Sequence, residues 1–182
     1  MNLLTIDTTT DQIILGLTFN NKNYYFQGEK NCKKHNELLL TYVDSFLTDN
    51  GATLSDIDVF GVVVGPGSFT GIRIGVATVN AFAMATKKKI VEITSLEQLD
   101  NGEEKLVLLD CRHGNYYVGK FGRTVEYMAL NESEIARIKL KKVYLTEVHP
   151  DAIQSKCNEK AELGLFVKQA KPFYLKKSSA EY

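Results

Sequence analysis

One stretch restricts what this chain can fold into more than any other: residues 62–85, VVVGPGSFTGIRIGVATVNAFAMA. A strand-like apolar run is broken at residues 65–68, where glycine and proline favour a turn. A helix then follows, which Ser68 or Thr70 can cap and which runs to about residue 85. Its last fourteen residues contain only three polar side chains, those of Arg73, Thr78 and Asn80. A helix that is apolar on nearly every side has to be buried on nearly every side.

One flank of this helix is almost free of large side chains. The small residues recur at helical spacing and are Gly67, Gly71, Gly75, Thr78 and Ala81. Because glycine inside a helix costs about 1 kcal/mol relative to alanine, a close contact should compensate for it. Two interpretations remain open here. The helix packs on its own sheet, or it lies between its own sheet and a second protein.

The totals exclude a strong electrostatic attraction to nucleic acid or an anionic membrane. The chain has 182 residues and carries 22 basic and 22 acidic side chains. Short basic runs, such as Lys87-Lys88-Lys89 and Lys176-Lys177, are more typical of solvated ends than of binding patches. Three cysteines without metal or redox spacing, and no recognisable signal peptide or long apolar segment, predict a cytoplasmic protein.

Hydrophobic patterning predicts a mixed α/β sheet for the first hundred residues. Strands are expected at 3–6, 12–19, from 24, at 57–64 and at 90–93, with helices at 35–49 and 70–85. Because hairpins come first and crossover helices follow, the helices should cover the faces of the sheet.

The pattern then begins again. Sliding the chain by 103 positions aligns Leu3 with Leu106, Asp7 with Asp110 and Gly16 with Gly119. The second half is predicted to contain strands at 106–109, 116–119, 125–130 and 142–145, a short helix capped by Asn131, and helical pieces near 151–156 and 159–168. This is the signature of a duplicated unit whose second copy has fewer and shorter elements.

Paired hairpins that each begin with an aspartate are how actin-like and sugar-kinase-like ATPases hold a metal ion and phosphates. Those hairpins are glycine-rich, because backbone N–H groups must approach the phosphate oxygens closely. Here Asp7 is followed by Thr8 and Thr9, and Asp110 by Cys111 and Arg112. The paired glycine that seats adenosine is also absent. We therefore expect an ATPase-type scaffold with a degenerate phosphate site, and the alternative is a small ATPase or kinase that uses the two aspartates.

Other sites are less well supported by the sequence. Residues 65–71 resemble a dinucleotide-binding loop, but the third glycine is one place late and hairpins precede it. No P-loop or nucleophile elbow is present. Because no two histidines have the spacing of a helical metal site, we expect no metal, no cofactor and no catalytic residue. His35, at the start of a helix, is interpreted as a cap or contact residue.

Several motifs together resemble the TsaB (YeaZ) family. They are, in order, LLTIDTTT, HNELLLTYVDSFL, DIDVFGVVVGPGSFTGIRIGVATVNAFA, ITSLEQL, LDCRHGNYYVG and KPFYLKK. The resemblance covers residues 1–120 well and 121–170 thinly. It implies an actin-like, heat-shock-chaperone-like fold, with a first ribonuclease H-like lobe at 1–100 and a reduced second lobe at 101–182.

The resemblance also implies a function. Such proteins are non-catalytic partners of TsaD, the subunit that transfers threonylcarbamoyl to adenosine 37 of tRNAs reading codons that begin with adenine. TsaE joins the TsaB–TsaD pair, tRNA is reached indirectly, and family members also pair with themselves. The resemblance places the partner interface on the two helices at 35–49 and 70–85. The residues expected there are His35, Leu39, Tyr42, Ser68, Phe69, Thr70, Gly71, Arg73, Ile74, Gly75, Thr78, Val79 and Phe82.

Overall fold

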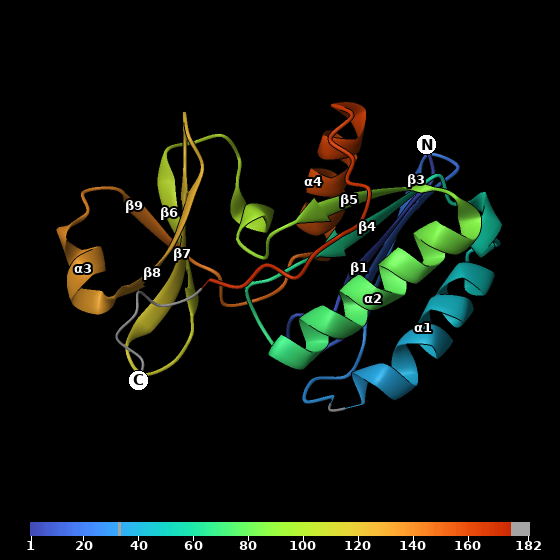
Figure 1. The fold of residues 1–182 in the computed structure, drawn as a ribbon, viewed down its shortest axis with the longest axis horizontal. Coiled ribbons are helices and arrows are strands. Elements are labelled where there is room, and N and C mark those ends of the chain that lie inside the picture. Colours follow the sequence, from blue (N-terminus) through green and yellow to red (C-terminus); the bar gives the residue numbers. More distant parts are fainter. Residues whose placement is uncertain (33, 176–182) are drawn as a thin grey trace.

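The chain folds around two β-sheets that stand side by side (Figure 1). The computed structural model describes residues 1–32 and 34–175. The first sheet has the strand order β3-β2-β1-β4-β5. Its strands are β1 (Leu3–Asp7), β2 (Ile14–Phe19), β3 (Lys22–Gln27), β4 (Val59–Val63) and β5 (Lys89–Ile93). β1, β2 and β3 are antiparallel neighbours, whereas β4 and β5 run parallel to β1, so the predicted mixed sheet is confirmed.

Helices α1 (His35–Asp49) and α2 (Phe69–Thr86) cover one face of this sheet (Figure 1). Strand alternation turns Leu4 and Ile6 of β1 toward the helices, where they join the core with Leu39 and Val79. Ser68 caps α2, because its Oγ accepts a hydrogen bond from the Gly71 N–H at 3.2 Å. The boundaries of both helices agree with the sequence prediction to within one residue.

Helix α4 (Pro150–Glu162) covers the other face of the same sheet. Leu3 and Val59 pack there against Ile153 and Cys157 of α4. The prediction of two helical pieces, at 151–156 and 159–168, is wrong. One continuous helix ends where Gly164 adopts a φ of +72°, and left-handed backbone of this kind terminates a helix.

A strap formed by residues 166–175 follows α4 and crosses to α2. The Val167 N–H donates to the carbonyl oxygen of Ile90 at 3.0 Å. The side chain of Asn80 both accepts from the Ala170 N–H and donates to the Ala170 carbonyl, at 2.9 and 3.0 Å. Hydrogen bonds therefore attach this C-terminal strap to the edge of the first sheet and to the middle of α2.

The second sheet repeats the topology of the first in a shorter form, with the order β8-β7-β6-β9. Its elements are β6 (Lys105–Asp110), β7 (Asn115–Phe121), β8 (Glu126–Asn131), α3 (Glu132–Arg137) and β9 (Lys141–Tyr144). β6 pairs antiparallel with β7 and parallel with β9, as β1 does with β2 and β4. Asn131 and Glu134 form the predicted capping box of α3.

The boundary at residue 100 between two lobes stays a proposal. The two sheets are built from residues 3–93 and 105–144, but α4 comes from the second half of the chain and packs on the first sheet. The 3-10 turns η1 (Leu54–Asp56) and η2 (Glu97–Leu99) complete the connections. Lys176 and Lys177, quoted as part of a family motif, lie outside the described residues.

Candidate functional site

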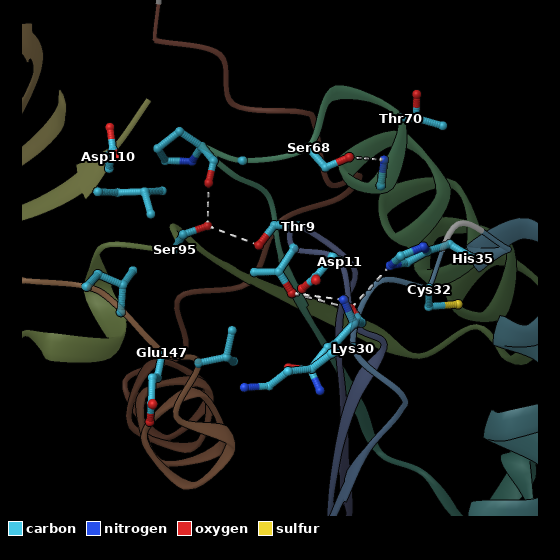
Figure 2. A pocket seen from close by; sticks show the side chains of 18 of the residues that line it. Thr9, Asp11, Lys30, Cys32, His35, Ser68, Thr70, Ser95, Asp110 and Glu147 are labelled. Carbon is cyan, nitrogen blue, oxygen red and sulfur yellow. Dashed lines mark hydrogen bonds between the residues drawn. The ribbon is translucent and has the colours of Figure 1, made fainter. Parts of the chain in front are cut away.

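A cleft of about 990 Å³ lies between the two sheets, where the β1–β2 turn meets the β6–β7 hairpin. The first turn contributes Thr9 and Asp11 to its wall, and the second contributes Asp110 (Figure 2). Arg112 of the second turn also lines the cleft. The start of α2 and the start of α1, with Ser68 and His35, complete the opening. The fold therefore brings both aspartate turns to one cleft.

Asp7 does not point into this cleft. Strand alternation places it on the α4 side of β1, and only 1% of its surface is exposed. Its Oδ1 accepts a hydrogen bond from the Thr9 N–H at 2.7 Å, while Oδ2 is the buried side-chain polar atom that has no partner among the described residues. Burial raises the pKa of this carboxyl, and the hydrogen bonds from Thr9 oppose that shift only in part. Asp7 closes its own turn and favours the neutral form.

Three backbone amides of the two turns are already bonded inside the turns and are not available to a bound phosphate. The Thr9 N–H is already bonded to Asp7. In the second turn, the Arg112 N–H donates to Oδ1 of Asp110 at 2.7 Å, and the Cys111 N–H donates to the carbonyl of Asn115 at 3.0 Å. Phosphate cradles work by presenting such N–H groups to the ligand. The residues present therefore do not fit the nucleotide that this type of fold can hold.

Acidic side chains in the cleft also disfavour a bound nucleotide. Asp11, Asp110 and Glu147 all line the cleft (Figure 2). Like charges repel, so these carboxylates oppose the entry of a polyphosphate unless a metal ion lies between them, and Lys30 and Arg112 are the lysine and arginine side chains beside them. Among the described residues no group of three or more histidine, cysteine, aspartate or glutamate side chains could hold a metal ion.

The floor of the cleft is a hydrogen-bonded junction of three loops. The Ser95 hydroxyl donates to the carbonyl of Pro66 at 2.7 Å and lies 3.4 Å from the hydroxyl of Thr9 (Figure 2). Gln98 extends the junction, since its Nε2 donates to the Ser95 carbonyl and its Oε1 accepts from the His149 N–H. Neither Ser95 nor Gln98 was expected from the sequence, because each acts through a partner far away in the chain.

His35 connects the start of α1 to the β1–β2 turn. Its Nε2 lies 3.2 Å from the carbonyl oxygen of Gln12, and the side chain is buried. This geometry supports the interpretation of His35 as a contact residue. Because the His35 side chain is buried, its assignment to a partner interface is not supported.

The glycine-rich flank of α2 faces the chain's own β1–β2 turn, which corrects the expectation that it faces a partner. A Cβ atom on Gly71 would lie 1.8 Å from the carbonyl oxygen of Thr8, and one on Gly75 would lie 2.4 Å from the Thr8 hydroxyl. The Thr8 hydroxyl donates to the Gly71 carbonyl at 2.7 Å. Gly71 and Gly75 allow one turn of this chain to approach and present nothing to a second protein, whereas Ala81 of the predicted flank is exposed.

Two further interface assignments are wrong for a related reason. Leu39 and Val79 are 1% and 0% exposed and belong to the core between the first sheet and helices α1 and α2. Tyr42 and Phe82 are only half-buried, but their rings pack on Phe26 and Phe60 of the same core. These side chains stabilise the fold, and a partner could contact only their edges.

An exposed face remains on the opposite side of α2, and we call it the outer face. It consists of Ala77, Ala81 and Met84 of α2 with Leu40 of α1, all exposed. Leu40 lies on the flank of α1 opposite Tyr42, which packs on β3, so Leu40 faces the α2 side. Of the expected interface residues, Phe69, Thr70 and Arg73 are exposed beside this face, Ser68 is exposed at the cap, and Ile74 and Thr78 are half-buried. Helical spacing of Ala77, Ala81 and Met84 was the signal that could have identified the face.

Comparison with known proteins identifies the class to which this fold belongs. The family model described as TsaD, tRNA N6-adenosine threonylcarbamoyltransferase, matches residues 26–180. The chain therefore belongs to this family, whose actin-like, ribonuclease H-like fold the two mixed sheets reproduce.

Individual relatives point to one branch of that family. The tRNA threonylcarbamoyladenosine biosynthesis protein TsaB of Escherichia coli is 28% identical over 130 residues, which is 68% of this chain and 56% of that protein. TsaB of Buchnera aphidicola is 28% identical over 149 residues, 78% of this chain and 70% of the relative. YeaZ from Pseudomonas aeruginosa has the same fold, with a TM-score of 0.79 at 21% identity over 96% of this chain and 99% of that one. These relatives support TsaB (YeaZ) as the branch.

The chain spans little more than half the length of the E. coli relative. In the ranges that the structure describes, no helix combines the length and apolar character that a membrane crossing requires.

Proposed function

We propose that this chain is a non-catalytic partner subunit in the biosynthesis of threonylcarbamoyladenosine in tRNA. In this proposal it pairs with TsaD, which carries out the transfer at adenosine 37 of tRNAs reading codons that begin with adenine. TsaE joins the pair, and the assembly works in the cytoplasm. The named relatives support the pathway. The observation that carries the non-catalytic role is that the N–H groups of Thr9, Cys111 and Arg112 are already used inside the two turns.

The outer face is the surface that we assign to TsaD, or to a second copy when the chain is alone. It is apolar and exposed, and two of its four residues are alanine, so another helix pair can approach closely. Burial of roughly 800 Å² per partner would be ordinary for a stable pair. The proposed interface therefore lies on α1 and α2, as the resemblance implies, but it uses the exposed residues of these helices.

Reconstitution tests the proposal. Threonylcarbamoylation of tRNA is measured with TsaD, TsaE and a supply of the activated threonylcarbamoyl group, with and without this chain. We expect the chain to stimulate modification, and Ala81→Arg to abolish both stimulation and pairing, because a charged side chain would be buried in the interface. Thr48→Arg, an exposed substitution at the far end of α1, is the matched control. Equal rates with and without the chain would reject the proposal.

The alternative, an actin-like ATPase or kinase that uses Asp7 and Asp110, is tested separately. The volume of the cleft is the observation in its favour. Titration calorimetry of the isolated chain with ATP and Mg²⁺ should give no heat of binding. Micromolar binding that Asp110→Asn abolishes would support the enzyme instead.

A further inference from the structure

Two exposed aromatic rings and an arginine form a cluster where α2 begins and the C-terminal strap ends. The rings of Phe69 and Tyr174 stack, with centroids 5.3 Å apart and an interplanar angle of 30°. The guanidinium carbon of Arg73 lies 3.8 Å from the centroid of the Phe69 ring, and Nε donates to the Tyr174 hydroxyl oxygen at 3.0 Å. Phe69 and Tyr174 remain 56% and 42% exposed. We call Phe69, Arg73 and Tyr174 the aromatic cluster.

The two stretches of sequence that carry the aromatic cluster contain no carboxylates, although the chain as a whole is neutral. No aspartate or glutamate occurs between Asp58 and Glu92, or between Glu162 and Glu181. These two stretches contain α2 and the strap, and they hold eight of the 22 basic residues. Lys88 is paired with Asp58 at 3.6 Å, but Arg73, Lys168 and Lys171 are exposed. The balanced total therefore conceals two basic stretches of sequence, although Glu92 and Glu97 lie beside Lys171 and Phe173 of the strap.

We propose that the aromatic cluster binds unpaired bases of tRNA, with Arg73 and the strap lysines contacting phosphates. This inference rests on the proposed function, which supplies tRNA as the polyanion. Single-stranded nucleic acids are held by aromatic side chains on which bases stack, next to cations that follow the backbone. A guanidinium adds its own planar surface and charge to such a stack.

Charge and shape favour RNA over a protein at this cluster. The outer face already offers the small apolar residues that a helix pair requires, and the aromatic cluster lies beside it at the start of α2. The exposed Arg73 and Lys168, in stretches with no carboxylates of their own, match a polyanion, whereas a typical protein partner presents both signs of charge. Hydrogen bonds of Asn80 to Ala170 hold the strap that carries Tyr174, so the cluster is assembled before the ligand arrives.

Fluorescence anisotropy with a labelled anticodon stem-loop RNA tests the inference on the full chain at low salt. We expect Phe69→Ala and Tyr174→Ala each to weaken binding at least about fivefold, because each removes a stacking surface. Phe69→Trp should retain it. Arg73→Ala should lower the slope of log K against log salt concentration by about 0.7, the value for one phosphate contact on a single strand. A fully paired RNA of equal length should bind more weakly than the stem-loop.

Matched controls separate this effect from unfolding and from general charge. Tyr25→Ala removes an aromatic ring that is 44% exposed on β3, at the far edge of the first sheet, and should leave RNA binding unchanged. Arg123→Glu alters an exposed arginine in the turn between β7 and β8 and should have little effect. Each variant is checked for an unchanged midpoint of urea denaturation.

Three outcomes would overturn the inference. The first is that the chain fails to bind the stem-loop at low salt, and the second is that the cluster variants bind it as well as the controls do. The third is that the variants lose pairing with TsaD but keep RNA binding, which would make the cluster a protein contact. The proposed function is rejected by a separate result, namely tRNA modification that proceeds equally well without the chain. RNA binding through the cluster without stimulation of modification would reject the proposed function and leave this inference standing.

Discussion

At the residue scale, one close contact at Gly71 shows which flank of α2 packs inside the protein. The sequence left open whether the small-residue flank of α2 packs against the chain's own sheet or against a partner protein. The carbonyl oxygen of Thr8 lies where a Cβ of residue 71 would be. The occupant is the turn after β1, which only the folded chain brings to that position.

Gly71→Ala is therefore expected to destabilise the protein. Helix propensity alone would make the alanine variant more stable by about 1 kcal/mol. The contact with Thr8 should reverse that sign and lower the free energy of unfolding by about 2 kcal/mol, because backbone cannot move aside cheaply. Urea denaturation measures the difference, with Ala77→Gly on the exposed side as the control. A variant more stable than the parent would contradict the contact.

Asp7 leads to a prediction about pH. Burial raises the pKa of its carboxyl in the folded state above the ordinary value of about 3.8. The folded protein then holds a proton that the unfolded chain releases, so stability falls as pH rises from about 4 toward the folded pKa. Asp7→Asn removes this loss and should stabilise the protein at pH 7 by about 1 kcal/mol, with no gain below pH 4.

Denaturation midpoints of both proteins at several pH values check this prediction. Asp110→Asn, in the matching but exposed turn, is the control. If Asp7→Asn were less stable than the parent at pH 7, the carboxylate would have a favourable partner that the described residues do not supply.

At the scale of elements, the strap depends on α2 for its position. Asn80 makes two hydrogen bonds to the backbone of Ala170, both with partners that are at least half-buried. The polar Asn80 within an apolar helix, noted as an exception in the sequence, is thus explained by a segment ninety residues away.

Asn80→Ala should release the strap and leave α2 folded. We expect the free energy of unfolding to fall by about 1–2 kcal/mol, and amide hydrogen exchange at Val167 and Phe173 to accelerate because their N–H bonds to Ile90 and Val64 open more often. Amides inside α2 should exchange at the parental rate. Unchanged protection of the strap would show that Asn80 does not hold it.

At the scale of the whole molecule, the two halves of the chain share one core. Helix α4 supplies the cover for the face of the first sheet that carries Leu3, Val59 and Val91. Ion pairs of Lys160 with Glu97 and of Lys156 with Asp100 tie the same helix to η2. The first hundred residues therefore lack part of their own lobe.

A fragment of residues 1–100 should not fold stably by itself, because one apolar face of its sheet would be open to water. Adding a peptide of residues 145–175 should restore cooperative unfolding, which circular dichroism can measure. A peptide in which Ile153→Asp places a charge in that contact is the control. A fragment that folds cooperatively without the peptide would support an independent first lobe.

The sequence by itself determined most of the elements, their order and the repeat of one topology in two sheets, although it divided α4 into two pieces. Periodicity and turn chemistry are local, and α1, α2 and the cap by Ser68 followed from them directly. Only the tertiary structure decided which flank of α2 faces inward, which amides in the two aspartate turns are already bonded, and that Tyr174 stacks on Phe69. Each of these depends on contacts between residues distant in the chain, or on hydrogen bonds that a pattern of residue types does not specify. For that reason α1 and α2 were predicted correctly as elements, while some residues assigned to their exposed sides, such as Leu39 and Val79, are buried.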